Sequence, residues 1–339
     1  MQKIVHEGKL RSPLEKGPVP ISFNLIGYRN DLFTSNNPDD IIEFYNTFRD
    51  RASLIKWMKE RPKGVSYIHE VEGRKDIIVV IPIADFNGRY ARTCREEIFK
   101  GLHMIFIESG VGNFYFNYAH NCNVGIKKAL KYDPKWIIVS NDDMYKIDDI
   151  SVLINQLENI DNNKYMSVFT KPSRYHSFNT YVGKKRFLLR DITALIYYLK
   201  ERRLLNWRIA HKIVTKQNYD LKWGPGLRNK VLGKLLSSNT YFYTMTSSFT
   251  ILSSKFCKNK IEVFNETYQN GVEDWELSIE LSKFERTIID YKIGDIIGGT
   301  LGNDLKREIR DLVNNVYFNE RIQVLLQNKN NMMRDPTET

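Results

Sequence analysis

The chain has 339 residues, of which 42% are hydrophobic and 12% aromatic, and its formal net charge is +11. This length accommodates one large or two ordinary domains with a substantial core. No stretch approaches the ~20 consecutive apolar residues of a membrane span, and residues 1–10 lack the apolar region of a signal peptide, so we expect a cytoplasmic protein. The positive charge favours an anionic partner, which could be nucleotide phosphate, nucleic acid or an acidic membrane surface.

The three cysteines are Cys94, Cys122 and Cys257, which are odd in number and widely spaced. This pattern excludes a framework of paired disulfides and a CxxC metal site. We expect reduced thiols on small, partly buried side chains.

Residues 1–75 are predicted to be an N-terminal extension that packs on the core. An extended stretch near residues 21–28 precedes one helix, from about Asp40 to Lys59, which starts after Pro38 and stops before Pro62. Apolar residues recur along it at roughly helical spacing, and these are Ile41, Phe44, Tyr45, Phe48, Ile55 and Met58. The extension shows no catalytic motif.

From residue 76 onward, the pattern alternates between strands and helices. Short β-branched runs at Ile77–Ile81, Met104–Ile107 and Trp136–Ser140 predict three strands, with an amphipathic helix from about Asn123 to Tyr132 before the third. Strands joined by helical connections predict a mainly parallel sheet with right-handed crossovers.

The third of these strands runs directly into Asn141, Asp142 and Asp143. Carboxylates at the carboxyl edge of an open α/β sheet lie where such folds bind ligands. Their hard oxygens suit Mg²⁺ or Mn²⁺ shared with substrate phosphates. The alternative is that the two aspartates only end the strand and cap the next helix.

Residues 171–236 differ in composition from the rest, with sixteen basic and three acidic residues among regularly spaced apolar ones. We expect one or two basic amphipathic helices forming an insertion. Nucleic-acid binding is the least favoured interpretation because no recognised motif accompanies the charge. Contact with an anionic membrane surface and packing of the helices on the core both stay open, and they are compatible with each other.

The remaining chain is predicted to return to the core. Residues Thr240–Leu252 are aromatic and β-branched enough for one or two strands, and a loop and helix containing Gly271–Leu277 follow. Residues 304–339 have the pattern of a charged helical tail whose last ten residues are loose.

Three motifs in order resemble family 2 glycosyltransferases of the GT-A fold, and most closely the rhamnosyltransferase-like members. The motifs cover about residues 76–170 and 240–300, and they are Ile77–Pro82, then Ala119–Ile126 with Trp136–Asp143, then Phe264–Leu277. The resemblance implies an α/β nucleotide-diphospho-sugar transferase fold, with a mainly parallel sheet flanked by helices. Residues 76–170 would form the nucleotide-sugar-binding half, 171–236 the basic insertion and 237–303 the acceptor-binding half.

The resemblance also implies where the donor and its metal ion bind. Asp143 would hold Mg²⁺ or Mn²⁺, with Asp142 as a second ligand and with Asn141 and Asp142 near the ribose or diphosphate. Glu108 stands where the family usually has an aspartate that recognises the base, although loop capping is an alternative. The residues expected to line the nucleoside pocket are Pro82, Ile83 and Ala84.

Asn123 and Gly125 are expected to open a helix beside this site. Backbone N–H groups and a small residue there would let an anion approach closely. The alternative is that both are ordinary helix-start residues.

The implied activity is inverting, metal-dependent transfer of a sugar from a nucleotide-diphosphate sugar to a hydroxyl of a glycan, lipid-linked or protein-linked acceptor. Asp274 is the expected base, with Glu273 second, although an acid-rich solvated helix start would give the same pattern. The histidine that many relatives place after the last core strand is missing, and Gly298, Gly299 and Gly302 suggest a loop instead.

Two other functions stay open. A non-catalytic nucleotide-, nucleic-acid- or membrane-binding protein could have the same fold and use the basic segment. A nucleotidyltransferase would need a glycine-rich basic loop after the first strand, to which Asp85–Arg89 bears only a faint similarity. For a transferase acting on lipid-linked acceptors, a peripheral position at the inner membrane surface is an option beside the plain cytoplasm.

Overall fold

The computed structural model describes residues 4–5, 35, 37–113, 115–170, 177–185, 219–223, 237–245, 248–296 and 305–332. The extended stretch predicted near residues 21–28, the helices predicted across residues 187–213 and the glycine-rich loop at residues 297–304 lie outside these ranges.

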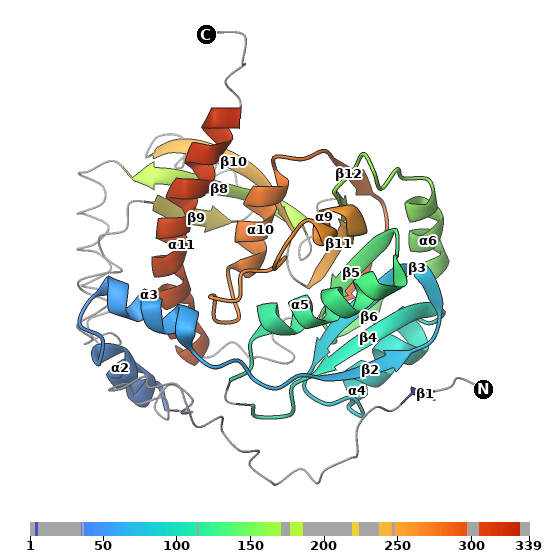
Figure 1. The fold of residues 1–339 in the computed structure, drawn as a ribbon, viewed down its shortest axis with the longest axis horizontal. Coiled ribbons are helices and arrows are strands. Elements are labelled where there is room, and N and C mark those ends of the chain that lie inside the picture. Colours follow the sequence, from blue (N-terminus) through green and yellow to red (C-terminus); the bar gives the residue numbers. More distant parts are fainter. Residues whose placement is uncertain are drawn as a thin grey trace.

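A mixed eight-stranded sheet forms the centre of the described fold, with helices on both faces (Figure 1). In spatial order its strands are β1 (Ile4–Val5), β2 (Tyr67–Val71), β4 (Leu102–Glu108), β3 (Arg74–Ile83), β5 (Trp136–Ser140), β11 (Phe249–Ser253), β7 (Ser167–Thr170) and β12 (Arg286–Ile289). The pairs β3–β4, β3–β5 and β7–β12 are parallel, whereas β2 and β11 run antiparallel to their neighbours. The prediction of an α/β fold with helices flanking a central sheet is therefore confirmed. The three predicted strands form the parallel middle of a sheet that is mixed as a whole.

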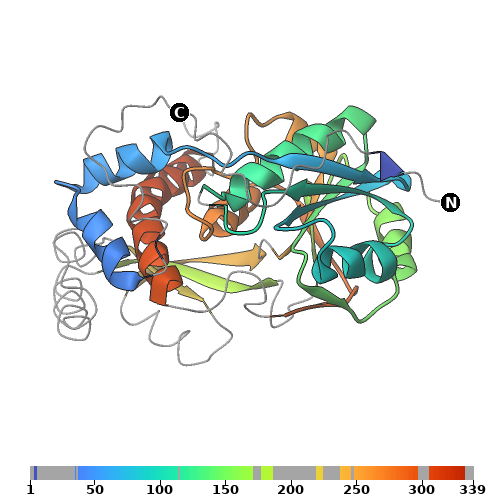
Figure 2. The same cartoon turned by 90° about the horizontal axis from the view of Figure 1, so that it is seen from below.

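The middle strands are buried on both faces, which explains their continuous β-branched sequences. Helix α5 (Tyr118–Ala129) covers one face, and α4 (Arg89–Thr93), the π-helical turn η1 (Cys94–Ile98) and α6 (Ile150–Glu158) cover the other. Figure 2 shows the green α5 and the teal α4 on opposite sides of the sheet. Cys94, Cys122 and Cys257 are all free and buried, as the sequence predicts.

Helix α5 begins five residues earlier than predicted, so Asn123 and Gly125 lie in its interior and do not open it. The helix starts at Tyr118 because Asn117 is extended and its side chain accepts a hydrogen bond from the backbone N–H of His120 (2.9 Å). The helix-start interpretation of Asn123 and Gly125 is therefore wrong, and each has another role.

Gly125 lets α5 lie directly on the sheet. A Cβ at this position would stand 2.2 Å from Cγ1 of Val80 in β3 and 3.1 Å from Cγ1 of Ile107 in β4. We expect Gly125→Ala to lower the free energy of unfolding by about 1–3 kcal/mol, because α5 must shift to admit the methyl group. Urea unfolding measures this, and Lys127→Ala, on the exposed side of the same helix, is the matched control. Equal stability of the two variants would contradict the packing role.

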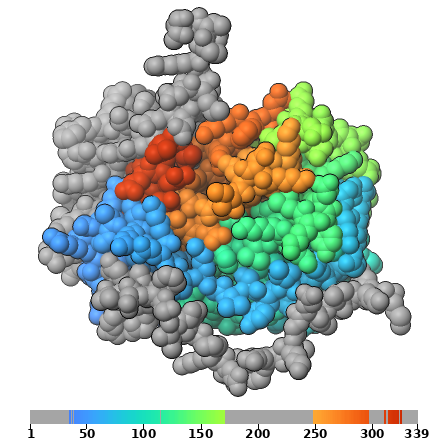
Figure 3. Space-filling model, in the orientation of Figure 1, coloured from blue at the N-terminus to red at the C-terminus, as the bar shows by residue number. Residues whose placement is uncertain are grey.

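The N-terminal region forms two helices, α2 (Pro38–Asn46) and α3 (Arg51–Glu60), where the sequence predicted one. The helix breaks because Asp50 is extended and caps α3, accepting from the backbone N–H of Ser53 (2.8 Å) while Ser53 Oγ accepts from that of Asp50 (3.2 Å). The predicted apolar residues are all buried in one cluster with residues of the long helix α11 (Leu305–Met332). Figure 3 shows this blue region close to the red α11.

One boundary also differs from the predicted organisation. Strand β2 and the start of β3 belong to the central sheet, so the sheet begins before residue 76. The predicted helical tail is confirmed by α11, which packs on α2 and on α10 (Glu273–Leu281). Among the described residues, no helix has both the length and the apolar character needed to cross a bilayer.

Part of the segment predicted as basic helices is β-structure. Strands β8 (Ser177–Lys185) and β9 (Tyr219–Trp223) join β10 (Ser237–Met245) in a three-stranded antiparallel sheet beside α10. The prediction is wrong for these residues because Thr180, Tyr181 and Val182 favour strands and find partners along the full length of β10. The predicted strands in residues 240–252 are confirmed as β10 and β11.

Candidate functional site

The carboxyl ends of β3, β4 and β5 lie side by side at one edge of the sheet. The chain passes from β3 to β4 on one side and later returns to place β5 on the other side of β3. Open α/β sheets bind ligands at the carboxyl edge where the strand order reverses in this way. The candidate site is therefore the edge formed by the residues that follow Ile83, Glu108 and Ser140.

Asn141, Asp142 and Asp143 follow β5 at this edge and are held by backbone contacts. Asn141 N–H donates to the carbonyl of Ser248 (3.0 Å), and the Ile296 N–H donates to the carbonyl of Asp143 (2.9 Å). The second contact continues the two-stranded ladder of β6 (Met144–Lys146) and β13 (Ile293–Asp295). The two aspartates are thus fixed between two ladders.

Both aspartate side chains are largely buried, with Asp142 8% and Asp143 5% exposed. Cys94 of η1 contacts this segment, because its thiol donates to the carbonyl of Asp142 (3.4 Å). Burial, and then the negative charges of Asp142 and Asp143, raise the pKa of Cys94. The helix-capping alternative is wrong, because the cap of α6 is Asp149, which accepts from the Ser151 N–H (3.0 Å).

The chemistry of this pair fits a divalent ion that is shared with a substrate. Within the described part of the chain, no three His, Cys, Asp or Glu side chains gather as a metal site. Asp142 and Asp143 supply hard oxygen donors, but two carboxylates cannot complete the six-ligand shell of Mg²⁺. Phosphate oxygens and water would have to provide the remaining ligands.

The residues after β3 contribute mainly backbone to the edge. Pro82 and Ile83 are buried in the sheet, and the carbonyl of Ile83 accepts from the N–H of Ser109 (3.0 Å). Ala84 is half-buried, and the turn beyond it exposes Asp85 and Asn87. Of the three residues predicted to line the nucleoside pocket, Ala84 is the one with accessible surface at the edge.

Glu108 is held by a histidine from the neighbouring strand. Its Oε2 lies 2.6 Å from Nε2 of His69 in β2, and its side chain is 24% exposed. The His69 ring stacks on the Phe86 ring with 4.3 Å between the ring centroids. The Arg95 guanidinium lies over the same Phe86 ring, also 4.3 Å from its centroid. Sequence reasoning missed His69 because nothing in the sequence pairs it with Glu108.

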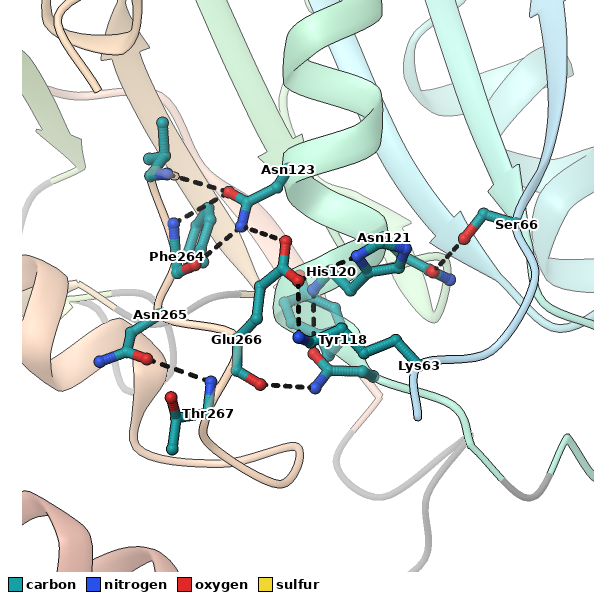
Figure 4. A network of polar contacts seen from close by, with 12 residues as sticks. Lys63, Ser66, Tyr118, His120, Asn121, Asn123, Phe264, Asn265, Glu266 and Thr267 are labelled. Carbon is teal, nitrogen blue, oxygen red and sulfur yellow. Dashed lines mark hydrogen bonds and ion pairs between the residues drawn. The ribbon is translucent and has the colours of Figure 1, made fainter. Parts of the chain in front are cut away.

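Asn123 binds the protein itself. Its Oδ1 accepts from the N–H groups of Val263 and Phe264 (3.0 Å each), and its Nδ2 donates to the Phe264 carbonyl (2.8 Å) and to Glu266 Oε1 (3.0 Å) (Figure 4). These four bonds use both acceptor sites and both donor hydrogens of an asparagine amide. The Asn123 side chain therefore has no capacity left for a phosphate.

Glu266 is the partner that sequence reasoning did not assign a role. Besides Asn123, its carboxylate contacts His120 Nδ1 (3.0 Å) and Lys63 Nζ (3.4 Å) (Figure 4). Burial raises the pKa of Glu266, but the hydrogen bonds from His120 and Asn123 outweigh it and lower the pKa to about 2. Residues 263–266 are thus fastened to α5, and we call this arrangement the clamp.

We expect Asn123→Asp to weaken the clamp strongly. The substitution keeps the acceptor oxygen for Val263 and Phe264 but replaces the donor to Glu266 with a second negative charge. The free energy of unfolding at neutral pH should fall by about 2–4 kcal/mol, since the two hydrogen bonds donated by the amide are lost and like charges face each other. Urea unfolding measures this, with Lys127→Ala on the same helix as control. Unchanged stability would show that the clamp contributes nothing.

Glu273 and Asp274 are the first residues of α10, after an unusual backbone turn. Asn270 and Val272 have positive φ angles of 52° and 77°. Val272 is β-branched, so this conformation is a strained one of the kind that concentrates at functional sites. Glu273 is buried and Asp274 is half-buried. The solvated-helix interpretation is therefore wrong for Glu273, and the Asp274 carboxylate is the more accessible of the two.

The third acid of this turn has a structural role. Glu276 Oε2 accepts from the hydroxyl of Tyr268 (2.6 Å), and its Oε1 accepts from Arg321 of α11 (2.7 Å). This network joins α10 to α11 and to Tyr268, in the loop that precedes α10. It therefore fixes the start of α10, where Glu273 and Asp274 lie.

The predicted site residues fall into three groups. Ala84, Glu108 and Asn141–Asp143 meet at the carboxyl edge of the sheet, whereas Glu273 lies beside Tyr118, in the first turn of α5, and interacts with it electrostatically. Asn123 and Gly125 belong to the packing of α5. Comparisons of the chain with protein-family models, with curated proteins and with solved structures each found no match.

Proposed function

We propose that this protein is an inverting, metal-dependent glycosyltransferase of the family 2, GT-A type, which moves a sugar from a nucleotide-diphosphate sugar to an acceptor hydroxyl. The observation that carries the proposal is the buried Asp142–Asp143 pair at the carboxyl edge of β5, where the strand order reverses. The mixed sheet with its parallel middle strands and the order of the three motifs along it support the same fold family. The acceptor would be a glycan or a lipid-linked or protein-linked molecule.

The residues at the edge have distinct tasks in this reaction. Asp143, with Asp142, would hold Mg²⁺ or Mn²⁺, which supplies neutralisation of the leaving diphosphate when bound. Backbone contacts on both sides of the aspartates hold this stretch of main chain at the edge of the sheet. Glu108, oriented by His69, is suited to accept a hydrogen bond from the nucleobase.

Asp274 would act as the base. The acceptor oxygen attacks the anomeric carbon, its proton passes to the Asp274 carboxylate, and the bond from that carbon to the phosphate oxygen breaks with both electrons going to the diphosphate. Attack from the side opposite the leaving group inverts the configuration. Glu276 cannot take this role because its carboxylate is already bound by Tyr268 and Arg321.

A panel of nucleotide sugars tests the proposal, with donor hydrolysis and transfer as readouts and calorimetry of nucleoside diphosphates with and without Mn²⁺. We expect Mn²⁺ to be required for tight nucleoside diphosphate binding. Metal-independent binding without turnover of any donor would instead indicate the non-catalytic binding protein. The same panel identifies the donor sugar, which depends on pocket shape and not on motifs.

We infer that the protein works in the cytoplasm or at the inner membrane surface, where lipid-linked acceptors are found. The high positive charge of residues 171–236 supports the membrane alternative. Most of that segment lies outside the described residues.

A further inference from the structure

Glu273 is a buried acid with an unusual setting. Its side chain is 3% exposed, and among the described residues its Oε2 has no hydrogen-bond partner. The backbone N–H groups of Gly271 and of Glu273 itself interact with the carboxyl group. The side chain therefore turns back under its own helix start and does not extend into solvent.

The groups that act most strongly on Glu273 include no cation. They are Asp274 of α10, Asp311 of α11 and, from α5, Tyr118 and Cys122. An ionised Glu273 would be a buried negative charge beside two further acids, which is a costly arrangement without a paired cation. Burial first and then the charge of Asp274 raise the pKa of Glu273 to about 8, against the lowering effect of the two backbone N–H groups.

We propose that Glu273 remains a neutral carboxylic acid during turnover and acts as a positioning residue that leaves Asp274 as the ionised member of the Glu273–Asp274 pair. This inference rests on the proposed function, because it assigns Asp274 the role of base. While the pair holds one proton, burial keeps that proton on Glu273, so the Asp274 carboxylate is the one that accepts the acceptor's proton. The different surroundings of the two acids thus give them different roles, with Glu273 protonated and Asp274 as the base.

The sequence and backbone explain how the two acids are separated. Val272 in the left-handed conformation directs the chain so that Glu273 lies inward against α5, while Asp274 stays half-buried at the rim. An ordinary helix start would present adjacent acids to solvent, where the positive end of the helix dipole favours their ionised forms.

The test uses Glu273→Gln, which keeps the size and neutrality of the acid but cannot ionise. Loss of a general base costs ~10²-fold or more in kcat, so a positioning role for Glu273 predicts a smaller loss at pH 7 in this variant than in Asp274→Asn. Above about pH 8 Glu273 ionises in wild type and places a second negative charge beside Asp274, whereas the variant stays neutral, so their pH profiles of kcat should diverge there.

A second readout needs no turnover. Between pH 4.5 and about 8 the folded protein retains a proton on Glu273 that the unfolded chain has lost, so the stability of the folded state falls as the pH rises through this window. The urea midpoint of wild type should therefore decline relative to that of Glu273→Gln between pH 5 and 9. Glu280→Gln, on the same helix and paired with Lys260, is the matched control and should not alter the pH dependence.

Two results would overturn the inference. One is a Glu273→Gln variant that binds nucleoside diphosphate normally but is as slow as Asp274→Asn at every pH. The other is a difference in urea midpoint that does not change with pH. Failure of wild type to bind any nucleoside diphosphate or to transfer any sugar would instead overturn the proposed function, whatever the unfolding data show about Glu273.

Discussion

Asp143→Asn should abolish metal-dependent donor hydrolysis and transfer. A metal ion contributes several kcal/mol of charge stabilisation in such a transition state, so kcat/KM should drop by ~10³-fold or more. Asp143 is the better-buried member of the pair, and its carbonyl accepts from the Ile296 N–H, so its main chain is fixed at the edge of the sheet. Activity assays over a range of Mn²⁺ concentrations measure the effect.

The control for this variant is Glu97→Gln, which removes an exposed acid from η1 without touching the edge of the sheet. It should have wild-type activity and metal dependence. Calorimetry with nucleoside diphosphate and Mn²⁺ should show weakened binding for Asp143→Asn only. Wild-type turnover of Asp143→Asn at saturating metal would remove the central claim of a metal site at the end of β5.

Asp274→Asn should slow transfer by roughly 10²–10⁴-fold, or about 3–5 kcal/mol of barrier, while nucleoside diphosphate binding stays intact. The amide keeps the size of the side chain but cannot accept the proton of the acceptor hydroxyl. Single-turnover assays with saturating donor and acceptor separate this chemical step from binding. The metal-dependent heat of nucleoside diphosphate binding should match wild type.

Slow transfer by Asp274→Asn identifies the base only if α10 keeps its fold. Urea unfolding of this variant should therefore be compared with that of Glu280→Gln, on the same helix. Wild-type turnover by Asp274→Asn would reassign the base. Loss of nucleoside diphosphate binding in this variant would place Asp274 in the donor site, which contradicts its assignment as the base.

Local sequence patterns determined the framework of this protein. The β-branched runs of β3, β4 and β5 predict parallel strands because strands buried on both faces need continuous apolar residues. Parallel strands share one carboxyl edge, so the same patterns place Asn141–Asp143 and Glu108 together. The two strands after residue 236 and the helical tail also follow from local composition.

Tertiary structure alone decided what the individual side chains do. The local sequence predicts that Asn123 starts a helix. In the folded chain its amide group instead makes all of its hydrogen bonds to Val263, Phe264 and Glu266, about 140 residues away. Glu108 meets His69 only through the pairing of β2 with β4.

The same holds for burial and for local breaks in pattern. The basic segment contains β8 because β10 pairs with it, and the predicted N-terminal helix divides where Asp50 caps α3. Glu273 and Asp274 are equivalent in the sequence, yet the left-handed Val272 and the packing of α10 against α5 bury one more deeply than the other. Hydropathy and spacing are local properties, whereas hydrogen-bond partners, burial and the resulting pKa depend on segments that meet only in the folded chain.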